Sequence, residues 1–221
     1  MRIGILKELH TDGVTIVPDT LKKNSALAPF FFIEKGAGQM AGFKDEDYEK
    51  YAKTTSREEV LSNSDILISQ EAIHENELQK IKKGAIYISQ FEPFNQPDIS
   101  QTLKKYGIQG FSLDMIPRST IAQSMDVLSS MASIAGYKSV LMAADRLNRH
   151  FPMMMTAAGT IRPAKVLVLG AGVAGLQAIA TARKLGAMVE AFDVRKASKE
   201  EVESLGAKFV EVEGAADDAS A

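Results

Sequence analysis

The sequence predicts an α/β protein with two Rossmann-like lobes, each built on a parallel sheet, joined by a long helix. Three observations predict this fold. The first half alternates short apolar runs with polar stretches of helix-forming residues, a pattern typical of βαβ units. A stretch over residues 123–147 carries apolar residues at helical spacing. A third stretch, from residue 164, joins a short strand to a glycine-rich turn and an Ala-rich helix.

The composition of the 221 residues excludes several function classes. Hydrophobic residues make up 45% and charged residues 24%, which is ordinary for a globular protein. A net charge of −2 gives no electrostatic reason to expect nucleic acid or an anionic membrane as partner. The absence of cysteine excludes disulfides, thiolate zinc sites and thiol catalysis, and fits a reducing compartment. The N-terminus becomes charged after six residues, so it makes a poor secretory signal.

The first lobe is expected over residues 1–123. Its candidate strands are Arg2–Leu6, Phe30–Glu34, Asp65–Ser69, Ala85–Gln90 and Gly107–Leu113. Helix-like spacing lies between them, at Asp45–Thr54, Ser56–Ser62, Glu75–Ile81 and Pro97–Tyr106.

A connecting segment is expected over residues 124–163. Val127, Met131, Ile134 and Leu141 recur at helical spacing, with Leu128, Ala132 and Ala135 on an adjacent row. Two apolar rows predict a long helix that is more buried than a surface helix. The stretch from Phe151 to Pro163 holds two prolines, a glycine and three methionines, and is expected to be a linker with adaptable packing.

The second lobe is expected over residues 164–221. The predicted order is strand Val166–Leu169, helix Val173–Leu185, strand Met188–Phe192, helix Ser198–Leu205 and strand Lys208–Val212. This is one mononucleotide-binding half, and the polar residues after Val212 are too few for the other half. We therefore expect a half-complete lobe whose first strand has a free flank, which should lower its stability and its affinity for a dinucleotide.

The motif Gly170-x-Gly172-x-x-Gly175 lies between the first strand and the first helix of this lobe. Gly170 is expected to allow a tight turn, Gly172 the approach of backbone amides to a diphosphate, and Gly175 close packing of helix on strand. Asp193 ends the next strand, where a carboxylate accepts hydrogen bonds from a ribose diol. Together these features predict a nicotinamide dinucleotide site that prefers NAD to NADP.

Val166 to Ala182 is uncharged over 17 residues, near the lower limit of about 17–25 for a membrane span. Three glycines, and the charged residues that bracket the stretch, favour a buried strand followed by a helix. No membrane insertion is expected.

Two blocks of sequence carry a family resemblance. One runs from Pro117 through Gln123-Ser124-Met125-Asp126 to Gly136-Tyr137, and the other runs from Phe151 through the glycine motif to Asp193-Val194-Arg195. Together they resemble the NAD-binding domain I, the alpha subunit in bacteria, of proton-translocating nicotinamide nucleotide transhydrogenase. Alanine dehydrogenase is the nearest relative of that family.

The resemblance implies that Arg118, Gln123, Asp126 and Ser129 lie beside the nicotinamide, with Ser124 and Met125 in the same segment. It places Val173, Asp193, Val194 and Arg195 around the adenosine half. Gln123 and Asp126 are three residues apart at an expected helix start, so their side chains should share one face. The alternative is that they cap the long helix.

The resemblance also implies the wider setting. NAD(H) would pass hydride to NADP(H) on a separate domain III, coupled to proton movement through a transmembrane domain II. It further implies a homodimer that is cytoplasmic and peripheral at the inner membrane through its partner subunits. Hydride transfer between nicotinamide rings needs no acid or base, and His10, His74 and His150 are far apart in the sequence and expected on the surface.

Some positions depart from the family pattern. Gly13 stands where the family has an arginine, Gln70 and Glu71 follow a strand where alanine dehydrogenases carry a lysine, and Ile121 replaces a second arginine. The residues at Gly13, Gln70 and Glu71 argue against alanine dehydrogenase activity, whereas Ile121 departs from the transhydrogenase pattern. Two alternatives stay open beside the transhydrogenase component. One is a non-catalytic NAD-binding or assembly module, and the other is a soluble oxidoreductase of the alanine dehydrogenase type.

Overall fold

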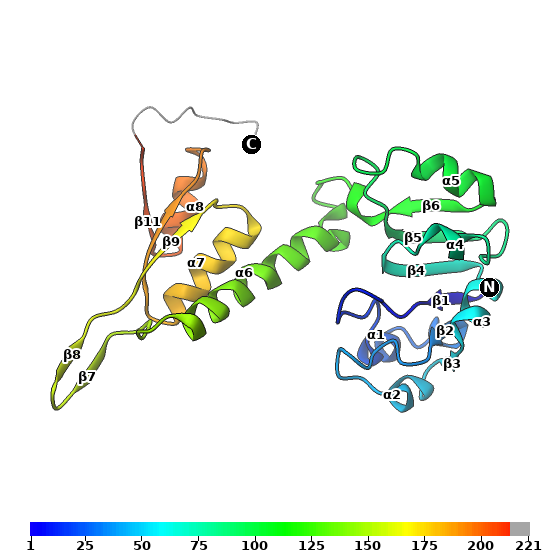
Figure 1. Ribbon diagram of the computed structural model, residues 1–221, viewed down its shortest axis with the longest axis horizontal. Helices are drawn as coiled ribbons and strands as arrows, with labels where there is room; N and C mark the ends of the chain where they lie inside the picture. Colours follow the sequence, from blue (N-terminus) through cyan, green and yellow to red (C-terminus); the bar gives the residue numbers. More distant parts are fainter. Residues whose placement is uncertain (213–221) are drawn as a thin grey trace. The chain divides into compact units, whose positions relative to one another are not determined.

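The computed structural model describes residues 1–212 of the chain. The chain folds as two compact units, residues 1–126 and the residues from 127 onward, and each unit has its own sheet (Figure 1).

The first unit is a parallel six-stranded sheet in the order β3-β2-β1-β4-β5-β6. The strand order reverses between β1 and β4, as in a doubly wound Rossmann-like fold. The strands are β1 Ile3–Ile5, β2 Phe31–Glu34, β3 Lys53–Thr55, β4 Ile66–Glu71, β5 Ile86–Gln90 and β6 Gln109–Ser112. The helices are α1 Pro18–Lys23, α2 Asp45–Glu49, α3 Arg57–Asn63, α4 Glu75–Leu78 and α5 Ile99–Tyr106, and three short 3₁₀ helices span Ala28–Phe30, Leu113–Met115 and Ala122–Met125.

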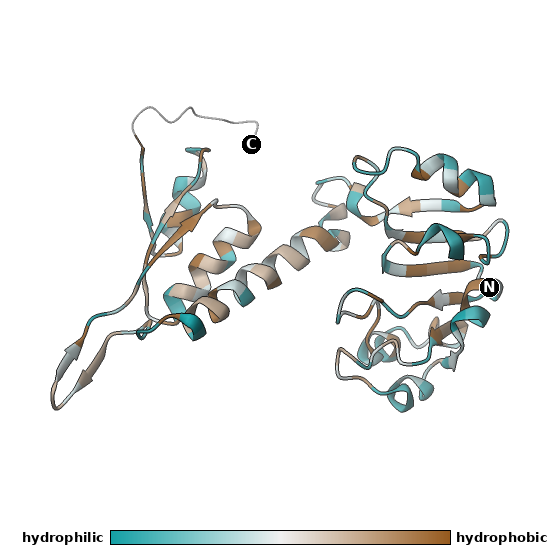
Figure 2. Cartoon of the chain, in the orientation of Figure 1, coloured by the Kyte–Doolittle hydropathy of each residue, from teal (hydrophilic) through white to brown (hydrophobic). Residues whose placement is uncertain are grey.

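Aliphatic residues of the central strands form the core of this unit. Ile5 of β1 lies opposite Ile33 of β2 and Ile68 of β4 in the parallel register. Ile5 and Ile33 are fully buried, as is Tyr87 of β5. Apolar strand residues become fully buried when helices cover both faces of a parallel sheet. Figure 2 shows the hydrophobic colouring along β4 and β5.

The bounds of one predicted helix in this unit need correction, and one helix and one strand were not predicted. The helix expected over Asp45–Thr54 ends at Glu49, and the strand β3 follows it. Helix α1 was not predicted at all. Strand β3 is short and lies at the sheet edge, so it lacks the long apolar run that identifies a buried strand.

The second unit has a parallel three-stranded sheet in the order β11-β10-β9. Its strands are β9 Lys165–Leu169, β10 Met188–Phe192 and β11 Lys208–Phe209, and its helices are α6 Val127–Arg146, α7 Val173–Lys184 and α8 Ser198–Ser204. The helix and strand order from β9 to β11 is the βαβαβ order that the sequence predicts. The fold class, an α/β protein with Rossmann-like lobes built on parallel sheets, is confirmed.

Strand β9 lies at one edge of the three-stranded sheet. Among the described residues it pairs with β10 alone. Its side chains alternate, so that Val166 and Val168 pack on the core while Leu167 and Leu169 are 58% and 75% exposed. Within residues 1–212, one flank of this strand is therefore uncovered, as the sequence predicts, and one face is uncovered too, which the sequence does not predict.

Helix α6 packs along α7 through a small residue. A Cβ built on Gly136 would lie 2.1 Å from the backbone oxygen of Ala174, so the two helices approach as closely as glycine permits. The Ser133 hydroxyl donates to Oε1 of Gln177 at 3.4 Å beside this contact. Gly136, which the sequence offered only as part of a family block, is thus a packing residue.

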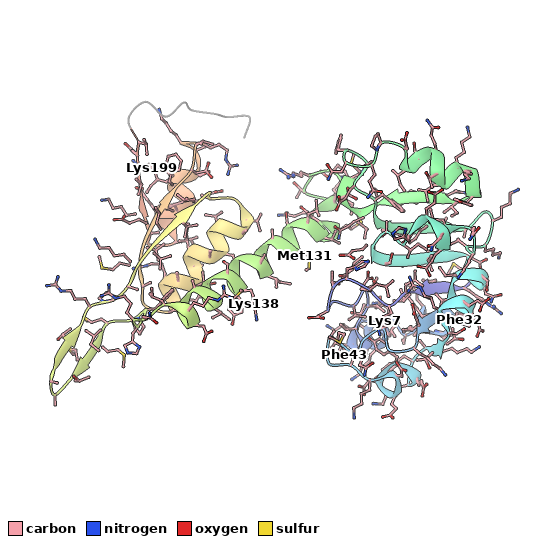
Figure 3. All side chains as sticks on the ribbon, viewed as in Figure 1. Lys7, Phe32, Phe43, Met131, Lys138 and Lys199 are labelled. Carbon is pink, nitrogen blue, oxygen red and sulfur yellow. The ribbon has the colours of Figure 1, made fainter. Side chains whose placement is uncertain are left out.

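The prediction that this helix is more buried than a surface helix is wrong. Of the α6 residues, Gly136 and Val140 are buried, whereas Met131 and Ile134 are exposed. Met131 and Lys138 are both labelled on α6 in Figure 3. Apolar spacing predicts that a helix forms, but it does not say how many of its sides another element covers.

One helix in the described part of the chain, α6, is long and apolar enough to cross a membrane by length and composition. The stretch from Val166 to Ala182, which raised that question in the sequence, is instead divided between β9 and α7. The prediction of a strand followed by a helix is confirmed there, but the strand is not buried as predicted, because Leu167 and Leu169 are exposed.

The expected linker contains a β-hairpin. Strands β7 Met154–Thr156 and β8 Gly159–Ile161 pair antiparallel, and all of their residues are exposed. Pro152 and Pro163 border the hairpin at a short distance. Prolines in those positions are typical of linkers as well, so the composition alone does not reveal the strands.

Candidate nucleotide-binding site

The candidate site lies where β9 leads into α7. Gly170 follows β9 with φ at +94°, and its amide donates to the Phe192 carbonyl at the end of β10 at 2.8 Å. This left-handed conformation suits glycine. The chain can therefore turn tightly from strand to helix, as the sequence predicts.

The other two motif glycines meet different surroundings. A Cβ on Gly175 would lie 1.8 Å from the Gly170 oxygen, so only glycine lets α7 sit this close to the loop. A Cβ on Gly172 would meet no atom within 4 Å. Gly172 therefore faces open space, where a bound group can approach the backbone.

The N-terminus of α7 carries the partial positive charge of the helix dipole. Gly172 precedes the helix without a side-chain capping hydrogen bond, and the first turn holds no acidic residue. The first amides of a helix lack intrahelical partners, and the helix dipole favours an anion there. The open loop in front of a 12-residue helix fits a diphosphate.

Asp193 lies directly after β10, and its side chain is 6% exposed. Its Oδ2 accepts from the Ala171 amide at 2.6 Å, which ties the carboxylate to the glycine loop. Its Oδ1 accepts from the Arg195 amide at 2.8 Å, and the Arg195 guanidinium donates to both oxygens.

These contacts fix the charge of the site. Hydrogen bonds from the Arg195 guanidinium lower the pKa of Asp193 to about 2, against burial, and the Ala171 and Arg195 amides act in the same direction. The same hydrogen bonds raise the pKa of Arg195. Asp193 is consequently an anion at neutral pH, the form that accepts hydroxyl donors.

The remaining adenosine-side candidates surround this loop. Val173 is the first residue of α7, and Val194 follows Asp193. Both are exposed. The structure thus brings Gly170, Gly172, Gly175 and Asp193 together in one site, with Val173, Val194 and Arg195 adjacent to them in the chain.

The candidates for the nicotinamide side are divided between the two units. Arg118 and the 3₁₀ helix that holds Gln123, Ser124 and Met125 belong to the first unit, and all four side chains are exposed. Asp126 ends that unit. Ser129 lies in the first turn of α6, in the second unit.

The expected shared face of Gln123 and Asp126 needs correction. Gln123 lies inside the 3₁₀ helix, whereas Asp126 follows it with extended backbone at ψ 90°, directly before α6. The α-helical spacing argument does not apply across this change of conformation.

A small cavity in the first unit was not predicted from the sequence. It has a volume of about 60 Å³ and lies at the carboxyl ends of β1 and β4, lined by Lys7, Glu8, His10, Arg57, His74 and Glu77 among others. His10 and His74, distant in the sequence, thus border the same space. Parallel sheets bind ligands where the strand order reverses, but finding that position requires the strand order.

Arg57, Glu77 and Glu8 of this cavity are engaged in ion pairs or hydrogen bonds within the protein. Arg57 donates to Glu77 at 2.7 and 2.9 Å and to Glu34 at 2.8 Å. Buried Glu8 accepts from the amides of Gln70 and Glu71 at 2.7 and 3.2 Å. These bonds tie the strand ends to each other, which favours a structural role.

Comparisons with known proteins agree with the two-unit architecture. Residues 4–135 match the family described as alanine dehydrogenase/PNT, N-terminal domain, and residues 139–220 match alanine dehydrogenase/PNT, C-terminal domain. Each half of the chain therefore matches the domain expected from its place in the sequence.

Individual relatives fall into two groups. The chain is 41% identical to NAD(P) transhydrogenase subunit alpha from Cereibacter sphaeroides, over 96% of its own length and 42% of that protein. It is 25% identical to alanine dehydrogenase from Methanococcus maripaludis, over 88% of this chain and 53% of that one. The chain thus spans roughly half the length of these curated relatives.

A solved structure of a transhydrogenase is similar to this chain in both fold and sequence. The crystal structure of transhydrogenase from Sinorhizobium meliloti superimposes with a TM-score of 0.90 and 41% identity, over 96% of this chain and 64% of that chain. By the family matches to both of its halves, the chain belongs to the alanine dehydrogenase/PNT family.

Proposed function

We propose that this chain is the NAD(H)-binding component of a proton-translocating NAD(P) transhydrogenase. One observation carries the proposal: an open glycine loop at the start of α7 is bonded to a buried, ionised Asp193. Higher identity to transhydrogenase alpha subunits than to alanine dehydrogenase supports the choice within the family.

The chain's own groups would divide the adenosine half of the dinucleotide between them. The loop amides from Gly172 to Ala174 would receive the diphosphate, because the dipole of α7 favours an anion there. Asp193 would accept the hydroxyls of the adenosine ribose. An ionised carboxylate at this position repels a 2′-phosphate, which favours NAD over NADP.

The nicotinamide end rests on the family resemblance. Arg118, Gln123, Asp126 and Ser129 would hold the carboxamide and its ribose, with Ser124 and Met125 shaping the same segment. The nicotinamide ring, when bound, supplies hydride chemistry in which no proton moves with the hydride. These residues would therefore orient the ring and exclude water, with no acid–base step assigned to them.

The proposed setting includes partners that lie outside this chain. NADP(H) would bind a separate domain III, and a transmembrane domain II would couple the reaction to proton movement. The chain would act as a homodimer, peripheral at the cytoplasmic face of the inner membrane. Without the NADP-binding partner it would be inactive, because the second nicotinamide ring would be missing.

A titration of NADH fluorescence tests the proposal first. Saturable binding in the micromolar range supports it. No binding by a folded chain would favour the assembly-module alternative.

Two activity assays follow the titration. Adding the NADP-binding component with NADPH and an NAD analogue should give hydride transfer. Oxidation of NADH by pyruvate with ammonium, in the absence of that component, would contradict the proposal and favour alanine dehydrogenase activity.

A further inference from the structure

The carboxylate of Asp193 is surrounded by hydrogen-bond donors of its own chain. Oδ1 accepts from the Arg195 amide at 2.8 Å and from Arg195 Nε at 3.1 Å. Oδ2 accepts from the Ala171 amide at 2.6 Å and from Arg195 Nη2 at 3.2 Å. A carboxylate offers about four acceptor positions, so these four donors fill them.

The four donors differ in how easily each can move away from the Asp193 carboxylate. The Ala171 amide is held in the glycine loop, where the neighbouring Gly170 amide bonds to the Phe192 carbonyl at 2.8 Å. The Arg195 amide is likewise part of the backbone. The guanidinium, in contrast, ends a flexible side chain that is 35% exposed, and its two bonds are the longest of the four.

A ribose diol has two hydroxyl donors and needs two acceptor positions. Those positions become available on Asp193 when the guanidinium withdraws, while both amides keep the carboxylate in place. Once withdrawn, the cation stays tethered two residues away, near the 2′ position of the ribose.

We propose that the Arg195 side chain is an internal competitor that the adenosine ribose displaces from Asp193, and that it sets the discrimination between NADH and NADPH. The inference rests on the proposed dinucleotide site. Arg195 weakens NADH binding, because it occupies the acceptors that the diol needs. It supports residual NADPH binding, because the displaced cation attracts a 2′-phosphate that Asp193 repels.

Two variants separate the contact from the charge. Arg195→Met removes both the guanidinium and its charge, whereas Arg195→Lys keeps a cation but loses the planar fork that spans both carboxylate oxygens. NADH and NADPH fluorescence titrations of the whole chain give the affinities, and thermal unfolding of each variant checks that it is folded.

The two variants are expected to change NADH affinity in the same direction and NADPH affinity differently. The Arg195 side chain is 35% exposed, so displacing its guanidinium costs little, and both variants should bind NADH about 2–5-fold more tightly than wild type. Arg195→Met should bind NADPH more weakly, and Arg195→Lys should keep NADPH binding close to wild type.

Two results would overturn the inference, and they differ from each other. If wild type binds NADH and both folded variants bind it equally or more weakly, Arg195 is no competitor, although the dinucleotide site stands. If folded wild type binds no NADH, the proposed function fails and this inference fails with it.

Discussion

At the scale of single residues, Asp193 has two tasks that the sequence did not separate. It is the expected acceptor for a ribose, and it also holds the Ala171 amide of the glycine loop at 2.6 Å. The spacing between Gly175 and Asp193 predicts the first task. The contact with the Ala171 amide depends on the pairing of β9 with β10, which brings Asp193 beside the glycine loop.

Replacing Asp193 by Ala should weaken NADH binding and relax discrimination against NADPH. A hydrogen bond to a charged group is worth about 1.5–3 kcal/mol, so NADH affinity should fall roughly 10–100-fold, and NADPH affinity less. Fluorescence titration measures both. Glu190→Gln, which removes a carboxylate from the same strand, serves as the control, and unchanged affinity of Asp193→Ala for both ligands would show that the ribose contact is misassigned.

Gly172 and Gly175 offer a matched pair that separates binding from folding. Gly172→Ala places a methyl group in open space with φ at −77°, so the fold should stay intact while NADH affinity falls at least several-fold. Gly175→Ala forces the methyl group against the Gly170 oxygen, and such overpacking costs about 1–3 kcal/mol. Thermal unfolding combined with NADH titration distinguishes them, and equal effects of both changes on both readouts would refute the assignment.

At the scale of helices and strands, the close contact between α6 and α7 depends on Gly136. Gly136→Ala would drive a Cβ into the Ala174 backbone, so the free energy of unfolding of the second unit should fall by about 1–3 kcal/mol. Lys138→Ala, at an exposed position of the same helix, should change it by less than about 0.5 kcal/mol. Urea unfolding followed by circular dichroism measures the difference, and equal stabilities would mean that the helices do not depend on this contact.

The ion pairs of Arg57 make a pH-dependent contribution to the first unit. Hydrogen bonds from Arg57 lower the pKa of Glu77 below its ordinary value of 4.5. A carboxyl group with a lowered pKa stabilises the fold above the unfolded-state pKa, and this stability is lost as the pH falls through the folded-state pKa.

Arg57→Met should therefore destabilise the chain by about 2 kcal/mol at pH 7, less than the 3–5 kcal/mol of a fully buried pair. The difference from wild type should shrink at pH 3. Urea unfolding at both pH values measures it, with Lys105→Met, which removes an exposed pair to Glu75, as control. A destabilisation that is the same at pH 3 and pH 7 would contradict the assigned charge interaction.

Most elements could be predicted from the sequence because their signals are local. The strand Met188–Phe192 is found within the bounds predicted, and the helix that begins at Val173 ends one residue short of its predicted end. Strand β3 escaped prediction because three residues at a sheet edge leave no clear period. The β7–β8 hairpin escaped prediction because the prolines that border it, and its glycine, are also typical of a linker.

The burial of α6 and the small cavity of the first unit could not be predicted from local sequence patterns. Apolar spacing at Met131 and Ile134 predicts a helix, but coverage of its sides depends on distant parts of the chain. The cavity near His10 and His74 lies at a reversal of strand order. Both features are non-local, so no window of sequence contains them.

At the scale of the whole molecule, the two units hold different groups of candidate residues. The glycine loop and Asp193 lie wholly in the second unit, and their contacts can be described directly. The nicotinamide-side candidates Arg118 and Gln123 belong to the first unit, and their role rests on family resemblance. The central claim is therefore that the second unit holds the dinucleotide by its loop amides and Asp193.

Backbone-amide NMR of the chain during an NADH titration tests that claim most directly. The expected result is a saturable set of chemical-shift changes concentrated at residues 170–175 and 193–195. Changes gathered instead around His10 and His74 in the first unit, with the glycine-loop amides unmoved at saturation, would contradict it.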